Sequence, residues 1–216
     1  MNLSTALTLG LTLGLRHALD VDHVVATATM VRGDGNVTGA LRIGALWGLG
    51  HSAVIVVLGG ALVASGMRFS ARWTLGAELI VCAMLVVLGA LSLRSSSADE
   101  RSAHEHSHEP SDASAHARPR SGLRSVMVGA VHGLAGSGST AVLAASSART
   151  TEEALAFLML FAVGTTLTMA AVTLALAQPL RWSARGAPAL QRRLIRGAGW
   201  LSVLVGGALA VHLLRG

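Results

Sequence analysis

The side chains best suited to chemistry lie together in the stretch RHALDVDHV, residues 16–24, which holds two histidines and two aspartates. The apolar segments on either side, LTLGLTLGL and VVATATMV, carry no charge at all. Ionisable groups in such a setting cost several kcal/mol unless they face the protein interior or a water-filled path. Imidazole and carboxylate together suit a first-row divalent cation such as Ni²⁺, Co²⁺ or Zn²⁺. The stretch therefore predicts a cation site.

On an ideal helix, His17, Asp20 and His23 fall within an arc of about 120°, and Arg16 shares that face. Asp22 lies off the face by about 100°, so it joins the site only if the helix unwinds or a neighbouring element reaches it. We interpret Arg16 as a counter-ion for the aspartates. The alternative is a structural ion-pair network that holds a helix bundle together, although histidines add little to such a network.

Two further histidines lie in apolar surroundings, His51 in GLGHSAV and His132 in GAVHGLAGSGS. A lone intramembrane histidine often serves only as a hydrogen-bonding contact between helices. Glycines beside both histidines allow helix backbones to approach closely, so we expect both side chains to converge on the 16–24 centre. The small-residue pairs with the spacing of close helix crossings are Gly10/Gly14, Gly44/Gly48 and Gly129/Gly133.

The elements that must position these residues are membrane-spanning helices. The chain has 216 residues, of which 52% are hydrophobic and 13% charged, whereas a soluble domain carries about 25% charged residues. An apolar run of about 20 residues spans a bilayer, and six such runs are present. We therefore predict an all-α membrane protein with six transmembrane helices, at residues 3–30, 41–67, 73–93, 125–148, 154–178 and 197–214.

Residues 94–124 separate two similar halves. This segment is rich in Ser, His, Glu and Arg, which predicts a disordered linker. GLRHALDVDH at 14–23 aligns with GAVHGLAGSG at 129–138, and GLGHSAVIVV at 48–57 aligns with AVGTTLTMAA at 162–171. The predicted units are repeat 1 (residues 1–93), the linker (94–124) and repeat 2 (125–216). Because each repeat has three spans, the two must be inverted in the membrane, as is common in secondary transporters.

The arginines predict the orientation. Most of them lie in the connecting segments 31–42, 94–124 and 181–196, all on one side of the predicted bundle. By the positive-inside rule that side is cytoplasmic. We therefore expect a multi-pass protein of the bacterial inner membrane with both termini outside. The linker would lie in the cytoplasm, where four of its histidines offer weak auxiliary metal capture: His104, His106, His108 and His116.

These motifs resemble those of the nickel/cobalt transporter family. RHALDVDH contains the His-x4-Asp-His signature at His17, Asp22 and His23; GLGHS and HGLAGS resemble the second motif and that of the short, six-helix, urease-accessory-type branch. The His-rich linker is similar to that of the related efflux proteins. The resemblance implies that His17, Asp20, Asp22 and His23 handle the metal, joined by His51 and His132. The chain departs from the longer importers because it has no acidic residue after Glu153.

The expected function is secondary transport of Ni²⁺ or Co²⁺ as substrate, with no permanent cofactor and no enzymatic activity. No GxxxxGK[ST] loop is present, so ATP hydrolysis by this chain is excluded, and proton coupling is the simplest hypothesis because protons compete with metal for the ligands. The expected partners are the metal ion and the lipid bilayer. A homo-oligomer or a cytoplasmic metallochaperone is left open. Nucleic acid is not expected, since aromatic residues make only 3% of the chain.

Other functions would each need their own residues. A serine protease using Ser137 and His212 lacks the Gly-x-Ser-Gly context, and a thiol–disulfide carrier is excluded because Cys82 is the one cysteine. A membrane haem protein would use His51 and His132 as axial ligands. The main alternative is proton-coupled transport of another small solute, with the charged cluster as its proton relay.

Overall fold

The structure is a computed structural model that describes residues 2–31, 36–67, 70–105, 119–134, 141–142 and 144–215. Within these ranges the chain forms seven helices and no strand. The helices are α1 (Leu3–His17), α2 (Val21–Met30), α3 (Val37–Ser65), α4 (Ala71–Glu105), α5 (Pro119–Gly133), α7 (Thr151–Gly186) and α8 (Pro188–Arg215). The predicted all-helical class is confirmed.

Four of the described helices are long and apolar enough to cross a membrane: α3, residues 71–95 of α4, residues 151–184 of α7, and α8. They coincide with four of the six predicted spans. The predicted span at 125–148 begins in α5, which ends at Gly133. The chain is thus a multi-pass membrane protein, and the count of six spans stays a prediction.

The first predicted span, residues 3–30, is not one continuous helix. α1 ends in a tight turn in which the Leu19 N–H donates to the Arg16 carbonyl (2.9 Å) and the Asp20 N–H donates to the His17 carbonyl (3.1 Å). Asp20 then takes the N-cap position of α2 with an extended backbone. Aspartate favours this position, so the sequence starts a new helix at the point where the charged cluster lies.

The linker and one basic connection are more helical than predicted. α4 continues to Glu105 and α5 begins at Pro119, so residues 94–105 and 119–124 are helical rather than disordered. Residues 94–105 contain neither Gly nor Pro, so nothing in them interrupts the helix. The basic connection at 181–196 is likewise helical except at Ala187. Residues 106–118 lie outside the described residues.

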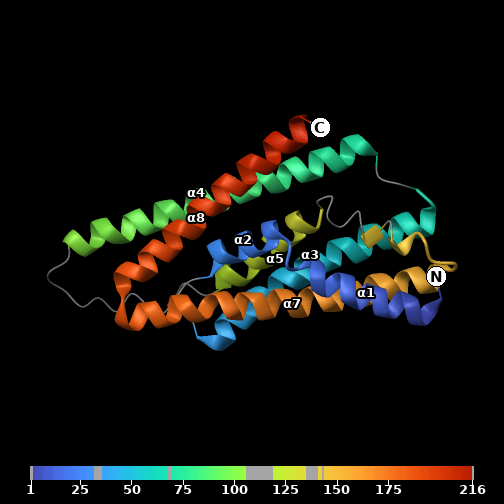
Figure 1. The fold of residues 1–216 in the computed structure, drawn as a ribbon, viewed down its shortest axis with the longest axis horizontal. Helices are drawn as coiled ribbons and strands as arrows, with labels where there is room; N and C mark the ends of the chain where they lie inside the picture. The colour runs from blue at the N-terminus through green and yellow to red at the C-terminus, as the bar shows by residue number, and fades with distance from the viewer. Residues whose placement is uncertain are drawn as a thin grey trace.

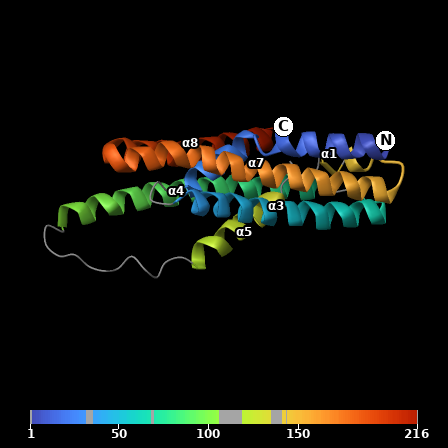
Figure 2. The same cartoon turned by 90° about the horizontal axis from the view of Figure 1, so that it is seen from below.

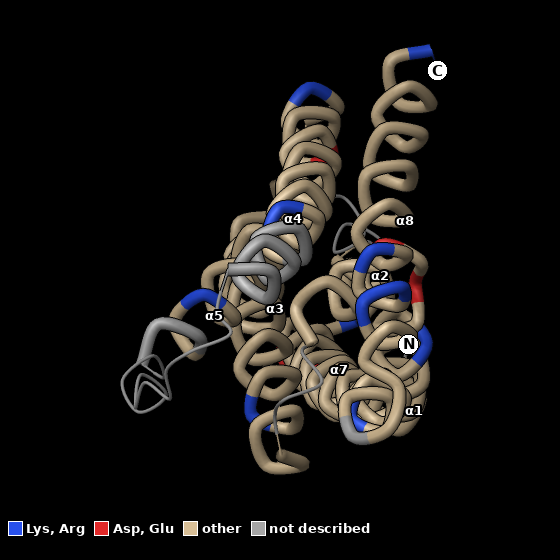
Figure 3. Tube along the Cα trace, turned by 90° about the vertical axis from the view of Figure 1, so that its left-hand side faces the viewer, with Lys and Arg blue, Asp and Glu red and all other residues tan. Residues whose placement is uncertain are grey.

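The described helices form two groups (Figure 1). α1 packs on α7, α7 on α3, and α3 on α5, whereas α4 and α8 pack mainly on each other. Figure 3 looks along the helices. It shows the α4/α8 pair on one side, α1, α3, α5 and α7 on the opposite side, and α2 between them. Figure 2 gives the same bundle from below. The charged half of the first span thus lies between the two groups.

Glycines allow the two 15-residue helices, α1 and α5, to pack closely against the longer helices α7 and α3. A Cβ on Gly10 of α1 would lie 2.5 Å from the carbonyl oxygen of Phe157 in α7. A Cβ on Gly129 of α5 would overlap the carbonyl oxygen of Trp47 in α3 and lie 2.9 Å from the backbone nitrogen of His51. No side chain larger than that of glycine fits at either crossing. Glycine therefore lets α1 pack closely on α7 and α5 pack closely on α3.

Gly129→Ala is therefore expected to destabilise the protein. Overpacking of this kind costs about 1–3 kcal/mol, because the methyl group meets backbone rather than a flexible side chain. Thermal unfolding of the purified protein in detergent measures the effect. The matched control is Gly207→Ala in α8, where nothing lies within 4 Å of the added Cβ. Equal melting temperatures for the two variants would contradict the packing argument.

Candidate metal site

Four buried histidines from four helices meet between the two groups. His17 lies in the last turn of α1, His23 in the first turn of α2, His51 within α3, and His132 in the last turn of α5. His17 is 7% exposed and the other three are 0% exposed. The His23 ring centroid lies 4.6 Å from that of His17, 5.0 Å from that of His51 and 4.3 Å from that of His132. The structure therefore brings together the four side chains that are expected to converge.

His17, His23 and His51 each offer a ligand atom within 4.8 Å of the other two. The Nε2 atoms of His17 and His51 face each other at 3.1 Å. Two nitrogens bound to one ion at about 2.0–2.1 Å are about 2.9–3.4 Å apart at ligand angles from octahedral to tetrahedral. The observed separation is that of a hydrogen bond between the two rings, and it also fits two imidazoles that share one cation.

Asp22 joins the histidines from the first turn of α2. One carboxylate oxygen accepts from His23 Nδ1 (3.1 Å) and the other from His132 Nε2 (2.8 Å). Asp22, His23 and His132 also offer ligand atoms within 4.8 Å of one another. The condition under which Asp22 joins the site, an unwound helix, is met because the helix is broken between His17 and Val21.

The two aspartates also orient the imidazoles. Asp20 accepts from His17 Nδ1 at 3.1 Å, so its carboxylate does not cap α2 although Asp20 is the N-cap residue. Asp22 does the same for His23. A carboxylate on one ring nitrogen fixes the tautomer and leaves the other nitrogen free for a metal. Asp20 belongs to neither ligand group, and its side chain is 50% exposed, so we interpret it as an orienting group.

Several buried nitrogens at the site have no hydrogen-bond partner in the described part of the chain: His23 Nε2, His51 Nδ1, His132 Nδ1 and Trp47 Nε1. A buried polar atom left unpaired costs about 1–3 kcal/mol. A deprotonated imidazole nitrogen is an acceptor that a cation satisfies. Of these atoms, His23 Nε2 belongs to the residue shared by both ligand groups, so its unpaired state supports a ligand at the cluster.

Trp47 is a member of the site that the sequence pattern did not single out. It is 1% exposed, and its ring centroid lies 5.8 Å from His23 and 5.9 Å from His132. The available signal was its position one helical turn before His51 in LWGLGH. The indole N–H only donates, so it cannot bind a cation directly.

The predicted counter-ion is not formed. Arg16 is exposed and, within the described residues, makes no ion pair with Asp20 or Asp22. It precedes His17 by one residue, and the two side chains therefore point about 100° apart. Histidines take the place predicted for Arg16, since each carboxylate is bonded to imidazole.

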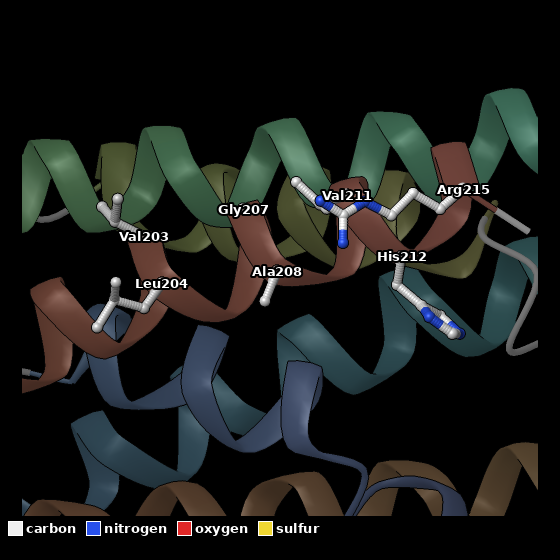
Figure 4. Close-up of a pocket in the computed structure, with 7 residues that line it drawn as sticks. All are labelled: Val203, Leu204, Gly207, Ala208, Val211, His212 and Arg215. Atoms are coloured by element: carbon white, nitrogen blue, oxygen red, sulfur yellow. The ribbon is translucent and has the colours of Figure 1, made fainter.

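The linker histidines and the rival sites give no second cluster in the described chain. His106, His108 and His116 lie outside the described residues, as does Ser137, and the side chain of His104 is not described. His212 lies with Val203, Gly207 and Arg215 along an open groove that α8 alone lines (Figure 4). For the haem hypothesis, the ring of His23 occupies the space beside both His51 and His132, so the geometry does not favour a porphyrin there.

Comparison with known proteins places the chain in a family. Residues 42–208 match the family model described as Cytochrome C biogenesis protein transmembrane region. This match includes His51 and His132 and begins after the 16–24 cluster. The chain is also 28% identical over 207 residues to the Urease accessory protein UreH of Bacillus sp. (strain TB-90), covering 95% of this chain and 90% of that protein. No solved structure matches. Because the family model matches most of its length, the chain belongs to the family of the cytochrome c biogenesis protein transmembrane region.

Proposed function

We propose that the protein transports a divalent first-row cation, Ni²⁺ or Co²⁺, across the membrane through the cluster of His17, Asp22, His23, His51 and His132. The observation that carries the proposal is the meeting of four buried imidazoles from four helices, with two Nε2 atoms 3.1 Å apart and three ring nitrogens that have no partner among the described residues. Imidazole-rich sets suit these metals. The relative named as a urease accessory protein supports a metal-supply role.

Thiol–disulfide transfer is a competing function for a membrane protein of this size. Electron transfer through a disulfide needs a pair of cysteines. The whole sequence contains one, Cys82, which is buried in α4. The chain therefore shares the family's fold but carries an imidazole site and no cysteine pair. Function depends on the site rather than on the fold.

We further propose that the two halves are inverted repeats. Under the alignment of the halves, His17 corresponds to His132, and each lies in the last turn of a 15-residue helix. The contacts are reciprocal. Gly14 packs on the backbone of Phe161 in the other half, and Gly129 packs on the backbone of Trp47 in the first. Likewise Ser52 donates to the Ala162 carbonyl, while Gly48 packs on Thr166.

The ends of two helices lie at the proposed transport site and favour a cation there. α1 and α5 both end at the cluster, and the C-terminal end of a helix carries a partial negative charge that favours a cation. Discontinuous helices that end at the substrate are a feature of secondary transporters with repeats. Metal ligands must be deprotonated, so proton exchange at the histidines would couple metal movement to a proton gradient.

We also propose an orientation of the protein in the membrane, based on its arginine-rich connections. The starts of α1 and α7 lie at one end of the bundle, and the ends of α4 and α7 lie at the other (Figure 1). The second end carries the arginine-rich connections, which we place in the cytoplasm of a bacterial inner membrane by the positive-inside rule.

Metal content of cells that express the protein tests the proposal. Cells are loaded separately with Ni, Co, Zn or Mn, and the metal is measured after washing. We expect nickel or cobalt content to change several-fold relative to cells with an empty vector, a rise meaning import and a fall meaning export. Unchanged content of all four metals in cells with correctly inserted protein would reject metal transport in favour of another solute.

A further inference from the structure

The five ligand residues do not form a single group. Among the described residues they fall into two groups of three, one with His17, His23 and His51 and one with Asp22, His23 and His132. Ligands on opposite sides of one ion, each at about 2.0–2.1 Å, are about 4.2 Å apart at most. Atoms that fall outside a common 4.8 Å group therefore cannot all bind one ion at one position.

We propose that the site consists of two successive cation positions that share His23. Position A is formed by His17, His23 and His51, and position B by Asp22, His23 and His132. The ion passes from one position to the other by leaving His17 and His51 for Asp22 and His132. On His23 the ion and the ring proton exchange nitrogens, with Nε2 serving position A and Nδ1 serving position B. This inference rests on the proposed metal transport and adds an internal step to it.

The surroundings of His23 support a shared ligand. Its ring lies between the two sets, with centroids 4.6 Å from His17 and 4.3 Å from His132. Its Nδ1 contacts Asp22 of position B, whereas its Nε2 is buried and has no partner in the part of the chain that the structure describes, which leaves Nε2 available to position A. A neutral imidazole has one lone pair on one ring nitrogen, so His23 serves one position at a time.

The two positions differ in charge and access. Position A has three imidazoles and no carboxylate, and it connects to the surface through Asp20, which is bonded to His17 and is half-exposed. Position B includes the carboxylate of Asp22, which is 18% exposed. A ligand set with a carboxylate suits harder cations, and an all-imidazole set suits nickel and its neighbours. An ion that alternates between the two positions is never bound by all five ligands at once. Each position therefore binds it less tightly than a joint site would.

The test uses the full chain purified in detergent and then reconstituted in liposomes. His132→Ala damages position B, the double variant His17→Ala/His51→Ala damages position A, and His23→Ala damages both. Ni²⁺ stoichiometry is measured by calorimetry, the ligands are counted by X-ray absorption, and Ni²⁺ flux is measured in the liposomes. Melting temperature and elution volume check folding, with His→Asn versions where an Ala variant is unfolded.

We expect His132→Ala and the double variant each to bind about one Ni²⁺ per chain, with different ligand spectra, while flux is lost in both. His23→Ala should lose binding by more than the ~10–100-fold that loss of an outer partner costs. If His132→Ala or the double variant, although folded, loses Ni²⁺ as completely as His23→Ala, the ligands form one joint site and the two-position inference is overturned. Wild-type protein that neither binds nor moves Ni²⁺ or Co²⁺ would instead overturn the proposed function itself.

Discussion

His23→Ala is expected to abolish nickel and cobalt transport while leaving the protein in the membrane at normal abundance. His23 is fully buried and belongs to both ligand groups, so its loss removes a donor from every three-ligand set in the described cluster. The removed side chain leaves a cavity among imidazoles, which reduces stability but does not remove any of the glycine-mediated helix crossings. Radioactive ⁶³Ni accumulation in intact cells, normalised to membrane abundance, measures the effect.

The matched control is His212→Ala, which makes the same change on the open groove of α8 (Figure 4). Transport by this variant should equal that of the wild type. Normal nickel accumulation by His23→Ala would mean that the cluster is a structural hydrogen-bond network, the alternative that the sequence left open.

Asp22→Asn is the second substitution with a large expected effect. The carboxylate accepts from His23 and His132 at the same time, whereas the amide of Asn offers one accepting oxygen and carries no charge. One histidine therefore loses its partner, and the dication loses the nearest buried negative charge. We expect the metal concentration for half-maximal transport to rise by more than the ~10–100-fold that loss of an outer partner costs; the concentration dependence of ⁶³Ni flux measures it.

Asp20→Asn provides the comparison on the same stretch. Asp20 contacts only His17 among the clustered histidines and is half-exposed, where solvent screens its charge. Its variant should lose much less affinity than Asp22→Asn. Equal losses for the two variants would show that total negative charge, rather than the bridging contacts of Asp22, determines affinity.

The sequence predicted the site residues better than their roles. His17, His23, His51 and His132 could be grouped because polar residues in long apolar runs have few alternatives to meeting one another. The roles of the aspartates depend on where α1 ends, and helix ends are set by a balance of local capping and packing that an ideal helix does not include. Both aspartates are expected at the site, Asp22 on condition that the helix unwinds; the structure meets that condition and gives Asp22 contacts with two histidines and Asp20 a contact with His17 alone.

Other differences have simple physical origins. Arg16 is expected to pair with the aspartates from its charge and its shared helix face, but histidines already occupy both carboxylates. The helical residues 94–105 were assigned to a disordered linker on polarity, although polar residues without Gly or Pro continue a helix readily. Trp47 was invisible to a search for ionisable groups, since its role is seen only from its contacts with two imidazoles.

Metal flux into liposomes that contain only the purified protein tests the central claim most directly. Wild-type protein and His23→Ala are reconstituted at equal amounts, a pH gradient is imposed, and internal Ni²⁺ and Co²⁺ are followed with a fluorescent indicator. We predict flux of at least one of these metals with the wild type, flux near that of empty liposomes with His23→Ala, and a loss of wild-type flux when the proton gradient is collapsed. Wild-type liposomes that take up neither metal, with the gradient in either direction, would contradict the assignment of this protein as a nickel or cobalt transporter.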